Sequence, residues 1–119
     1  MTDSVLRDCA KRFARKIVLL CKEMRNHQVD YVLIKQTIAS GTSIGANLHE
    51  AQYAQSTKDF LSKLEIALKE CNEVDYWLEL LTDTDQIPRK TGDALRKDCT
   101  DMRRMLVSSI RTLKNKQES

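Results

Sequence analysis

The amino-acid sequence predicts an all-α protein that folds as a single antiparallel up-and-down four-helix bundle. The chain has only three Gly and one Pro in 119 residues, and 31% of its residues are charged. This composition favours long amphipathic helices. Only 5% of the residues are aromatic, which argues against a β-sandwich or barrel. Because domains cluster at about 100–150 residues, we expect residues 1–119 to form one domain.

The first helix is expected over about residues 3–26, because apolar residues recur there at alternating intervals of four and three. Its apolar seam consists of Leu6, Ala10, Phe13, Ile17, Leu20 and Met24. A second helix, over about residues 30–53, has a small and polar centre that includes Gly41 and Gly45. Each glycine destabilises a helix by roughly 1 kcal/mol relative to alanine. We therefore expect a neighbouring helix to approach closely at these glycines.

The third helix, over about residues 57–82, has the strongest periodic signal. Ser56 and Asp59 resemble a capping box at its start. Its seam consists of Phe60, Leu64, Ala67, Cys71, Val74, Leu78 and Leu81. The fourth helix is expected over about residues 92–114, with Thr91 as N-cap and a frayed tail after it. Its seam consists of Leu95, Cys99, Met102, Leu106, Ser109 and Leu113.

The cysteines and the hydropathy indicate a cytoplasmic protein. Cys9, Cys21, Cys71 and Cys99 are far apart in the sequence and form no CxxC pair, so we expect reduced and buried thiols. The longest apolar run, residues 17–21, is too short for a membrane span or a signal sequence. We therefore expect no association with a membrane.

Apolar residues also occur outside the seams, in larger number than one bundle needs. They are Val18, Leu19, Ile66, Trp77, Leu80, Val107 and Ile110. This surplus predicts a second buried face and hence a homo-oligomer. The alternative is a scatter of ordinary exposed apolar residues.

Positive charge is concentrated toward the two ends of the chain. Residues 1–27 contain seven Lys/Arg against three Asp/Glu, and residues 84–119 contain nine against five. If the first and fourth helices are neighbours, these cations merge into one face that can bind nucleic-acid phosphates. The candidate binding residues are Lys11, Arg12, Arg15, Arg96, Lys97, Arg103, Arg104 and Arg111. The alternative is a solvated surface that is partly paired with Asp98 and Asp101.

A polar strip follows the second and third helices at helical spacing. It consists of Ser43, Asn47, Glu50, Lys63, Glu70 and Glu73. It is either a buried network that fixes helix register, a solvated face or a functional site. A di-iron site requires two Glu-x-x-His motifs, and neither His27 nor His49 follows a glutamate at that spacing. We expect no metal, no other cofactor and no catalytic residues.

The run from Ser40 to Ala51, SGTSIGANLHEA, resembles the second-helix signature of the bacterial four helix bundle protein family. This family includes proteins encoded within intervening sequences of 23S ribosomal RNA genes. The similarity extends over roughly residues 5–115 and includes the segment 106–114. In the third helix it continues at Phe60, Lys63, Leu64, Ile66, Ala67, Glu70, Glu73, Trp77 and Leu78.

The resemblance implies a ring-shaped homo-oligomer, typically a homopentamer, and no catalytic residues. The family is also distantly similar to the accessory variability proteins of diversity-generating retroelements, which are basic pentamers that bind nucleic acid. We therefore expect a non-enzymatic oligomeric scaffold that binds RNA or DNA through a basic face of the first and fourth helices. Residues 56–83 carry three Lys/Arg against seven Asp/Glu, so the third helix should not take part. The alternative is a protein–protein interaction scaffold with no nucleic-acid binding.

Overall fold

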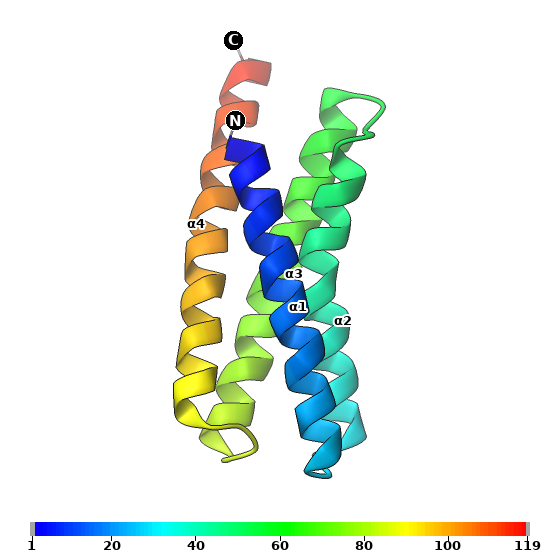
Figure 1. Cartoon of the computed structure of the whole chain (residues 1–119). Coiled ribbons are helices and arrows are strands. Elements are labelled where there is room, and N and C mark those ends of the chain that lie inside the picture. The colour runs from blue at the N-terminus through cyan, green and yellow to red at the C-terminus, as the bar shows by residue number, and fades with distance from the viewer. Residues whose placement is uncertain (1, 119) are drawn as a thin grey trace.

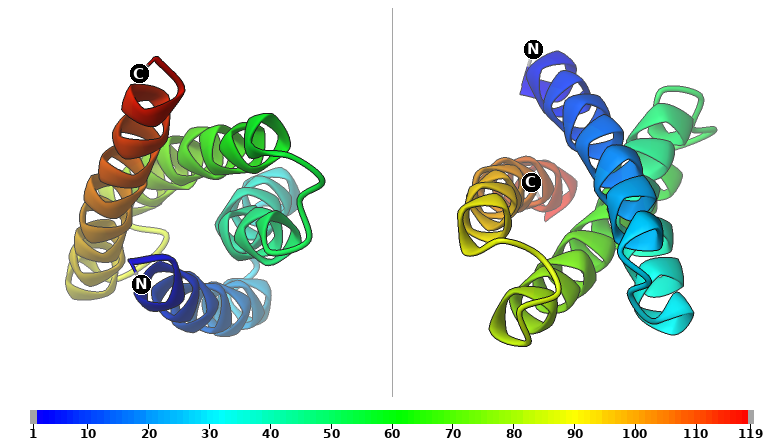
Figure 2. Two further views of the ribbon diagram at one scale, coloured as in Figure 1. Left: turned by 90° about the horizontal axis from the view of Figure 1, so that it is seen from above. Right: turned by 60° about the horizontal axis from the view of Figure 1, so that its bottom comes forward.

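The computed structural model describes residues 2–118 and contains four antiparallel helices (Figure 1). They are α1 (Thr2–Asn26), α2 (Tyr31–Ala51), α3 (Thr57–Asp83) and α4 (Arg89–Glu118). The bundle is elongated, with extents of 51 × 22 × 20 Å. Seen from above, the helices occupy the corners of a square in chain order, so that α1 lies beside both α2 and α4 (Figure 2). The predicted all-α four-helix bundle is confirmed.

The predicted seams form the core of the bundle. All six seam residues of α1 are buried, and so are those of α3 except the half-buried Phe60. On α4 the seam holds as far as Leu106, after which Ile110 is buried while Ser109 and Leu113 are only half-buried. This shift has a simple cause. A helix has 3.6 residues per turn, so a strict seven-residue repeat drifts around its surface.

The helix ends follow local capping chemistry. Asp30 accepts a hydrogen bond from the Val32 amide (2.9 Å), and the Ser56 hydroxyl accepts one from the Asp59 amide (3.0 Å), which confirms the predicted cap of α3. The predicted cap of α4 is wrong, because Thr91 lies inside the helix. Since proline has a helix-compatible φ and needs no amide partner, α4 begins directly after Pro88, whose carbonyl accepts the Gly92 amide at 3.0 Å. The helix then continues to Glu118, beyond the expected end at about residue 114, and the last residue of the tail predicted to fray lies outside the described residues.

All four cysteines are free thiols, as predicted. Cys21, Cys71 and Cys99 are buried and Cys9 is half-buried. Burial raises the pKa of the Cys21 thiol to about 11. The Cys71 thiol lies 3.4 Å from the carbonyl oxygen of Cys99 and links α3 to α4. Each buried thiol therefore acts as a small apolar residue of the core.

The two central glycines of α2 lie against α1, as predicted. A Cβ atom at Gly41 would lie 2.9 Å from both Cγ1 and Cγ2 of Ile17. A Cβ atom at Gly45 would lie 3.6 Å from the carbonyl oxygen of Ala10, which is an ordinary van der Waals contact. Gly41 is therefore required by packing, whereas Gly45 is not.

The two glycines should respond to alanine in opposite directions. Gly41→Ala should lower the free energy of unfolding by about 1–2 kcal/mol, because the new methyl group displaces Ile17 in a packed core. Gly45→Ala should raise it by up to about 1 kcal/mol through helix propensity. Urea denaturation followed by circular dichroism measures both changes. Equal changes of the same sign in the two variants would contradict the close approach at Gly41.

Candidate nucleic-acid interface

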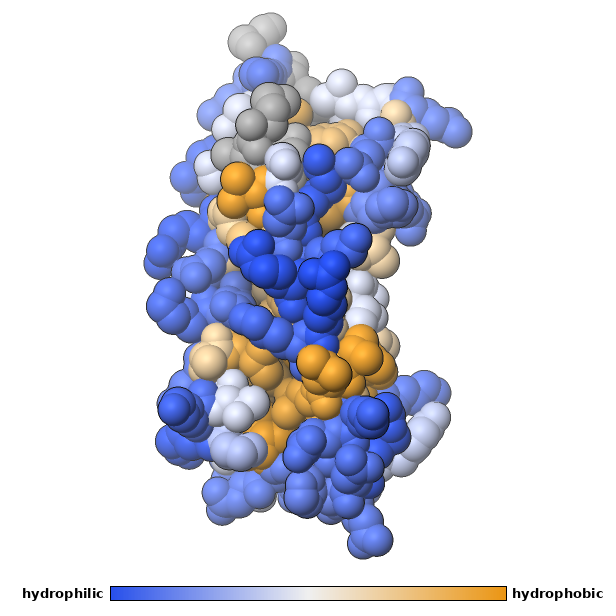
Figure 3. Space-filling model, in the orientation of Figure 1, coloured by the Kyte–Doolittle hydropathy of each residue, from blue (hydrophilic) through white to orange (hydrophobic). Residues whose placement is uncertain are grey.

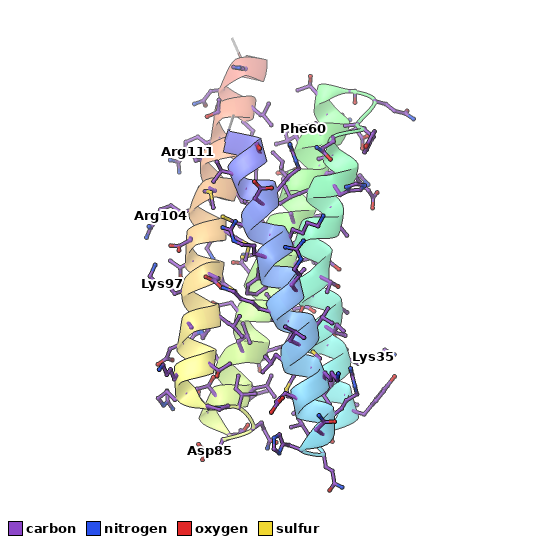
Figure 4. All side chains as sticks on the ribbon, viewed as in Figure 1. Lys35, Phe60, Asp85, Lys97, Arg104 and Arg111 are labelled. Atoms are coloured by element: carbon purple, nitrogen blue, oxygen red, sulfur yellow. The ribbon has the colours of Figure 1, made fainter. Side chains whose placement is uncertain are left out.

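A row of cations runs along the outer surface of α4. Lys97, Arg104 and Arg111 lie one heptad apart, are exposed and project sideways from the bundle (Figure 4). Lys97 pairs with Asp101 on its own helix at 3.3 Å. Arg104 and Arg111 make no ion pair with another described residue. Two guanidinium groups on this row are therefore available to an anionic partner.

Two other predicted binding residues of α4 are engaged within the bundle. Arg96 Nε lies 2.9 Å from one carboxylate oxygen of Asp75, and Arg103 Nη2 lies 3.0 Å from the other. Arg103 Nε also donates to Asn72 Oδ1 at 2.7 Å. The hydrogen bond to Asp75 raises the pKa of the Arg96 guanidinium. Asp75 thus connects α3 to α4. It also neutralises positive charge on Arg96 and Arg103, which the sequence predicts to bind nucleic acid.

The candidate binding residues of α1 also differ from one another in whether they have a partner within the bundle. Arg12 donates to the Cys9 sulfur at 3.4 Å, and the nearby Lys16 pairs with Asp98 of α4 at 3.0 Å. Lys11 and Arg15 are exposed and form no ion pair with a described residue. They belong to a longer row on α1. The surface is strongly hydrophilic over the middle of this helix, and an apolar patch interrupts it further toward the C-terminal end of α1 (Figure 3). The row consists of Arg7, Lys11, Arg15, Lys22 and Arg25.

The cations of α1 and α4 form two rows rather than the single merged face expected from the sequence. The α4 row projects sideways rather than toward α1 (Figure 4). The Lys16–Asp98 ion pair lies between the two helices. Arg7 was missed by sequence reasoning, although its spacing of four residues from Lys11 places both side chains on one helix face.

Most of the hydrogen bonds made by the polar strip join residues of the same helix. Asn47 Nδ2 donates to the Ser43 carbonyl oxygen at 2.8 Å, and the Ser43 hydroxyl donates to the carbonyl oxygen of Ala39. Across the helices, Lys63 Nζ lies 3.2 Å from Glu50 Oε1. The strip lies on the partly exposed surface where α2 meets α3, with Glu50 exposed and the other five side chains half-buried.

Comparison with known proteins identifies the family. A sequence model described as 23S rRNA-intervening sequence protein matches residues 2–108. The chain belongs to this family. It is also 48% identical to a protein of unknown function from the S23 ribosomal protein family of Bacteroides thetaiotaomicron, whose crystal structure it matches with a TM-score of 0.90. That match covers 93% of this chain and 99% of the other. No curated protein sequence matches the chain.

In this member of the 23S rRNA-intervening sequence protein family, the seven apolar surplus residues do not form one buried face. Val18, Leu19 and Ile66 are 45%, 67% and 39% exposed, whereas Ile110 belongs to the core. The remaining surplus residues, Trp77, Leu80 and Val107, are half-buried.

Two further features of this chain concern metal ions and membranes. Among the described side chains, those of residues 4–116, no group of three or more His, Cys, Asp or Glu is arranged to hold a metal ion. None of the described helices has the length and apolar character needed to cross a membrane.

Glu70 allows a test of whether the polar strip stabilises the fold. Partial burial, together with the neighbouring Glu73 carboxylate, raises the pKa of Glu70 above its ordinary value of 4.5. Ionised Glu70 therefore destabilises the fold at neutral pH, and this effect vanishes as the pH falls below 4.5. We expect Glu70→Gln to raise the urea midpoint at pH 7 and to leave it unchanged at about pH 3. A lower midpoint at pH 7 would instead favour a network that needs the carboxylate.

Proposed function

We propose that this protein is a non-enzymatic homo-oligomeric scaffold that binds RNA or DNA through the cations of α1 and α4. The α4 row is the observation that carries the proposal. Lys97, Arg104 and Arg111 project in one direction over about 20 Å, at a rise of 1.5 Å per residue, and two of them lack a described acidic partner. Arginine is well suited to phosphate because its guanidinium donates two parallel hydrogen bonds.

Oligomerisation would strengthen such a weak interface. Each added subunit repeats the α4 row, and after the first contact forms, the next one is intramolecular. The exposed apolar residues of α1 and α3 supply surface for self-association. The family resemblance favours a homopentamer. The free cysteines and the short apolar runs of the sequence favour a cytoplasmic location.

Light scattering tests the assembly directly. We expect a particle of about five times the 13.7 kDa of one chain, with closed cyclic symmetry. The measurement should be made at micromolar protein and repeated after dilution. A particle of 13.7 kDa at micromolar concentration would contradict self-association.

Nucleic-acid binding is tested by charge reversal on α4. Fluorescence anisotropy with labelled single-stranded RNA and duplex DNA should show binding by the wild type that weakens as salt rises. The double variant Arg104→Glu/Arg111→Glu should bind at least about tenfold more weakly, because phosphate contacts are replaced by repulsion. Lys35→Glu/Lys58→Glu, which makes the same change of charge at exposed lysines elsewhere, serves as control. Equal binding by the wild type and the α4 variant would show that α4 is not the site.

A protein–protein interaction scaffold is the second candidate. It is favoured by the apolar side chains that border the polar strip on α3, namely Ile66, Trp77 and Leu80. In this case the cations would serve solubility only. The same titration separates the two functions, because a wild type that binds neither RNA nor DNA at low salt would favour the protein–protein scaffold.

A further inference from the structure

A groove between α1 and α2 lies next to the α1 row of cations. It has a volume of about 380 Å³ and is bordered by Arg7, Lys11, Gly45, His49 and Gln52. Ligand pockets in proteins typically measure about 300–1,000 Å³. The groove is therefore large enough for a small ligand or one unit of a polymer.

Small residues of α2 create the open space. Gly45 and Ala46 line the groove together with Ala14 of α1. At Gly45 the backbone of α1 is close enough for a Cβ atom to touch the Ala10 carbonyl oxygen at 3.6 Å. The helices thus remain in contact at the base of the groove, while the lack of large side chains leaves its outer part open.

The side chains around the groove supply hydrogen-bond donors. With its amide oxygen directed toward α1, Gln52 accepts hydrogen bonds from Arg7 Nε at 2.9 Å and Nη2 at 3.2 Å. This contact holds the guanidinium in place and leaves its other N–H groups for a ligand. Lys11 makes no ion pair with a described residue, and His49 stands against Tyr53 with 5.7 Å between ring centroids.

The charge of the groove favours an anion. Arg7 and Lys11 contribute two permanent positive charges, and Asp8 is the one carboxylate among the lining residues. The net charge of these three side chains is therefore positive. A fixed guanidinium, a mobile ammonium and an imidazole beside an open space suit a phosphate group, which accepts several charge-assisted hydrogen bonds.

We propose that the α1–α2 groove binds the phosphate group of a nucleotide. Where the nucleotide belongs to an RNA strand, the inference rests on the proposed function and adds a phosphate subsite apart from the α4 row. Where it is a free nucleotide, the groove binds it independently of the α4 row. The phosphate lies against Arg7 and Lys11, and the remainder of the nucleotide extends along the groove toward His49.

The experiment uses the full chain with two probes, a labelled twelve-nucleotide RNA followed by anisotropy and adenosine 5′-monophosphate followed by calorimetry in phosphate-free buffer. Lys11→Glu reverses one charge in the groove. Gln52→Glu keeps the shape of the side chain and places a carboxylate against Arg7, which neutralises the guanidinium without removing it. Lys35→Glu, on α2 outside the groove lining, is the control.

We expect each groove variant to weaken binding of at least one probe by about tenfold or more, since a charge-assisted contact is lost, while the control retains wild-type binding. Loss with RNA alone assigns the groove to a strand, and loss with the mononucleotide assigns it to free nucleotides as well. Unchanged binding of both probes in both groove variants overturns the inference.

The same data separate this inference from the proposed function. If RNA binding is lost only in Arg104→Glu/Arg111→Glu, the function stands and the groove does not. If the wild type binds the mononucleotide but neither RNA nor the duplex DNA of the earlier titration, and Gln52→Glu abolishes mononucleotide binding, the groove stands and the function does not. A wild type that binds neither probe at low salt overturns the groove, and it overturns the function as well if duplex DNA is not bound.

Discussion

Replacing Phe13 with alanine should lower the free energy of unfolding by about 3–5 kcal/mol. Phe13 is 1% exposed and lies in the seam that α1 presents to the rest of the bundle. Truncation removes a large apolar side chain and leaves a cavity that the surrounding helices fill only partly. Urea denaturation at one fixed protein concentration measures the loss, because the stability of an oligomer depends on concentration.

The control for Phe13 is Val32→Ala, at an exposed apolar residue of α2. Val32 is 59% exposed, so its truncation should change stability by no more than about 0.5 kcal/mol. A loss of less than about 1 kcal/mol for Phe13→Ala would contradict the packing of α1. A large loss for Val32→Ala would indicate that this side chain is covered in the assembled protein.

Replacing Asp75 with alanine should lower the stability of the fold and at the same time strengthen RNA binding. It should lower the free energy of unfolding by about 1.5–3 kcal/mol, since hydrogen bonds to charged groups contribute in this range. The Asp75 side chain is only 21% exposed and contacts both Arg96 and Arg103. The same change should strengthen RNA binding, because two guanidinium groups beside the α4 row lose the nearby carboxylate of Asp75. Thermal denaturation and fluorescence anisotropy measure the two effects.

Glu79→Ala is the control for the second prediction. Glu79 also approaches Arg96, but at 3.6 Å and with 49% of its side chain exposed. Exposed ion pairs contribute about 0–1 kcal/mol, so this variant should be close to wild type in stability. If Asp75→Ala destabilises the fold but leaves RNA binding unchanged, Arg96 and Arg103 lie outside the nucleic-acid interface.

The sequence by itself determined which segments form helices and most of the residues with which α1 and α3 enter the core. The reason is that helical periodicity is a local property: residues three and four apart share a face whatever that face packs against. Capping is local too, so the start of α3 at Ser56 could be predicted. The start of α4 could not be placed as well, because Pro88 and Thr91 are both acceptable near a helix N-terminus.

The tertiary structure alone decided which cations are available. In the sequence, Arg103 and Arg104 are equivalent neighbours, yet Arg103 pairs with Asp75 of α3 and Arg104 projects from the bundle. Their side chains differ in direction by about 100° around the helix axis, and only the packing of α3 against α4 places a carboxylate beside one of them. The α1–α2 groove depends in the same way on helix packing, because Arg7 meets Gln52 only when the two helices lie side by side.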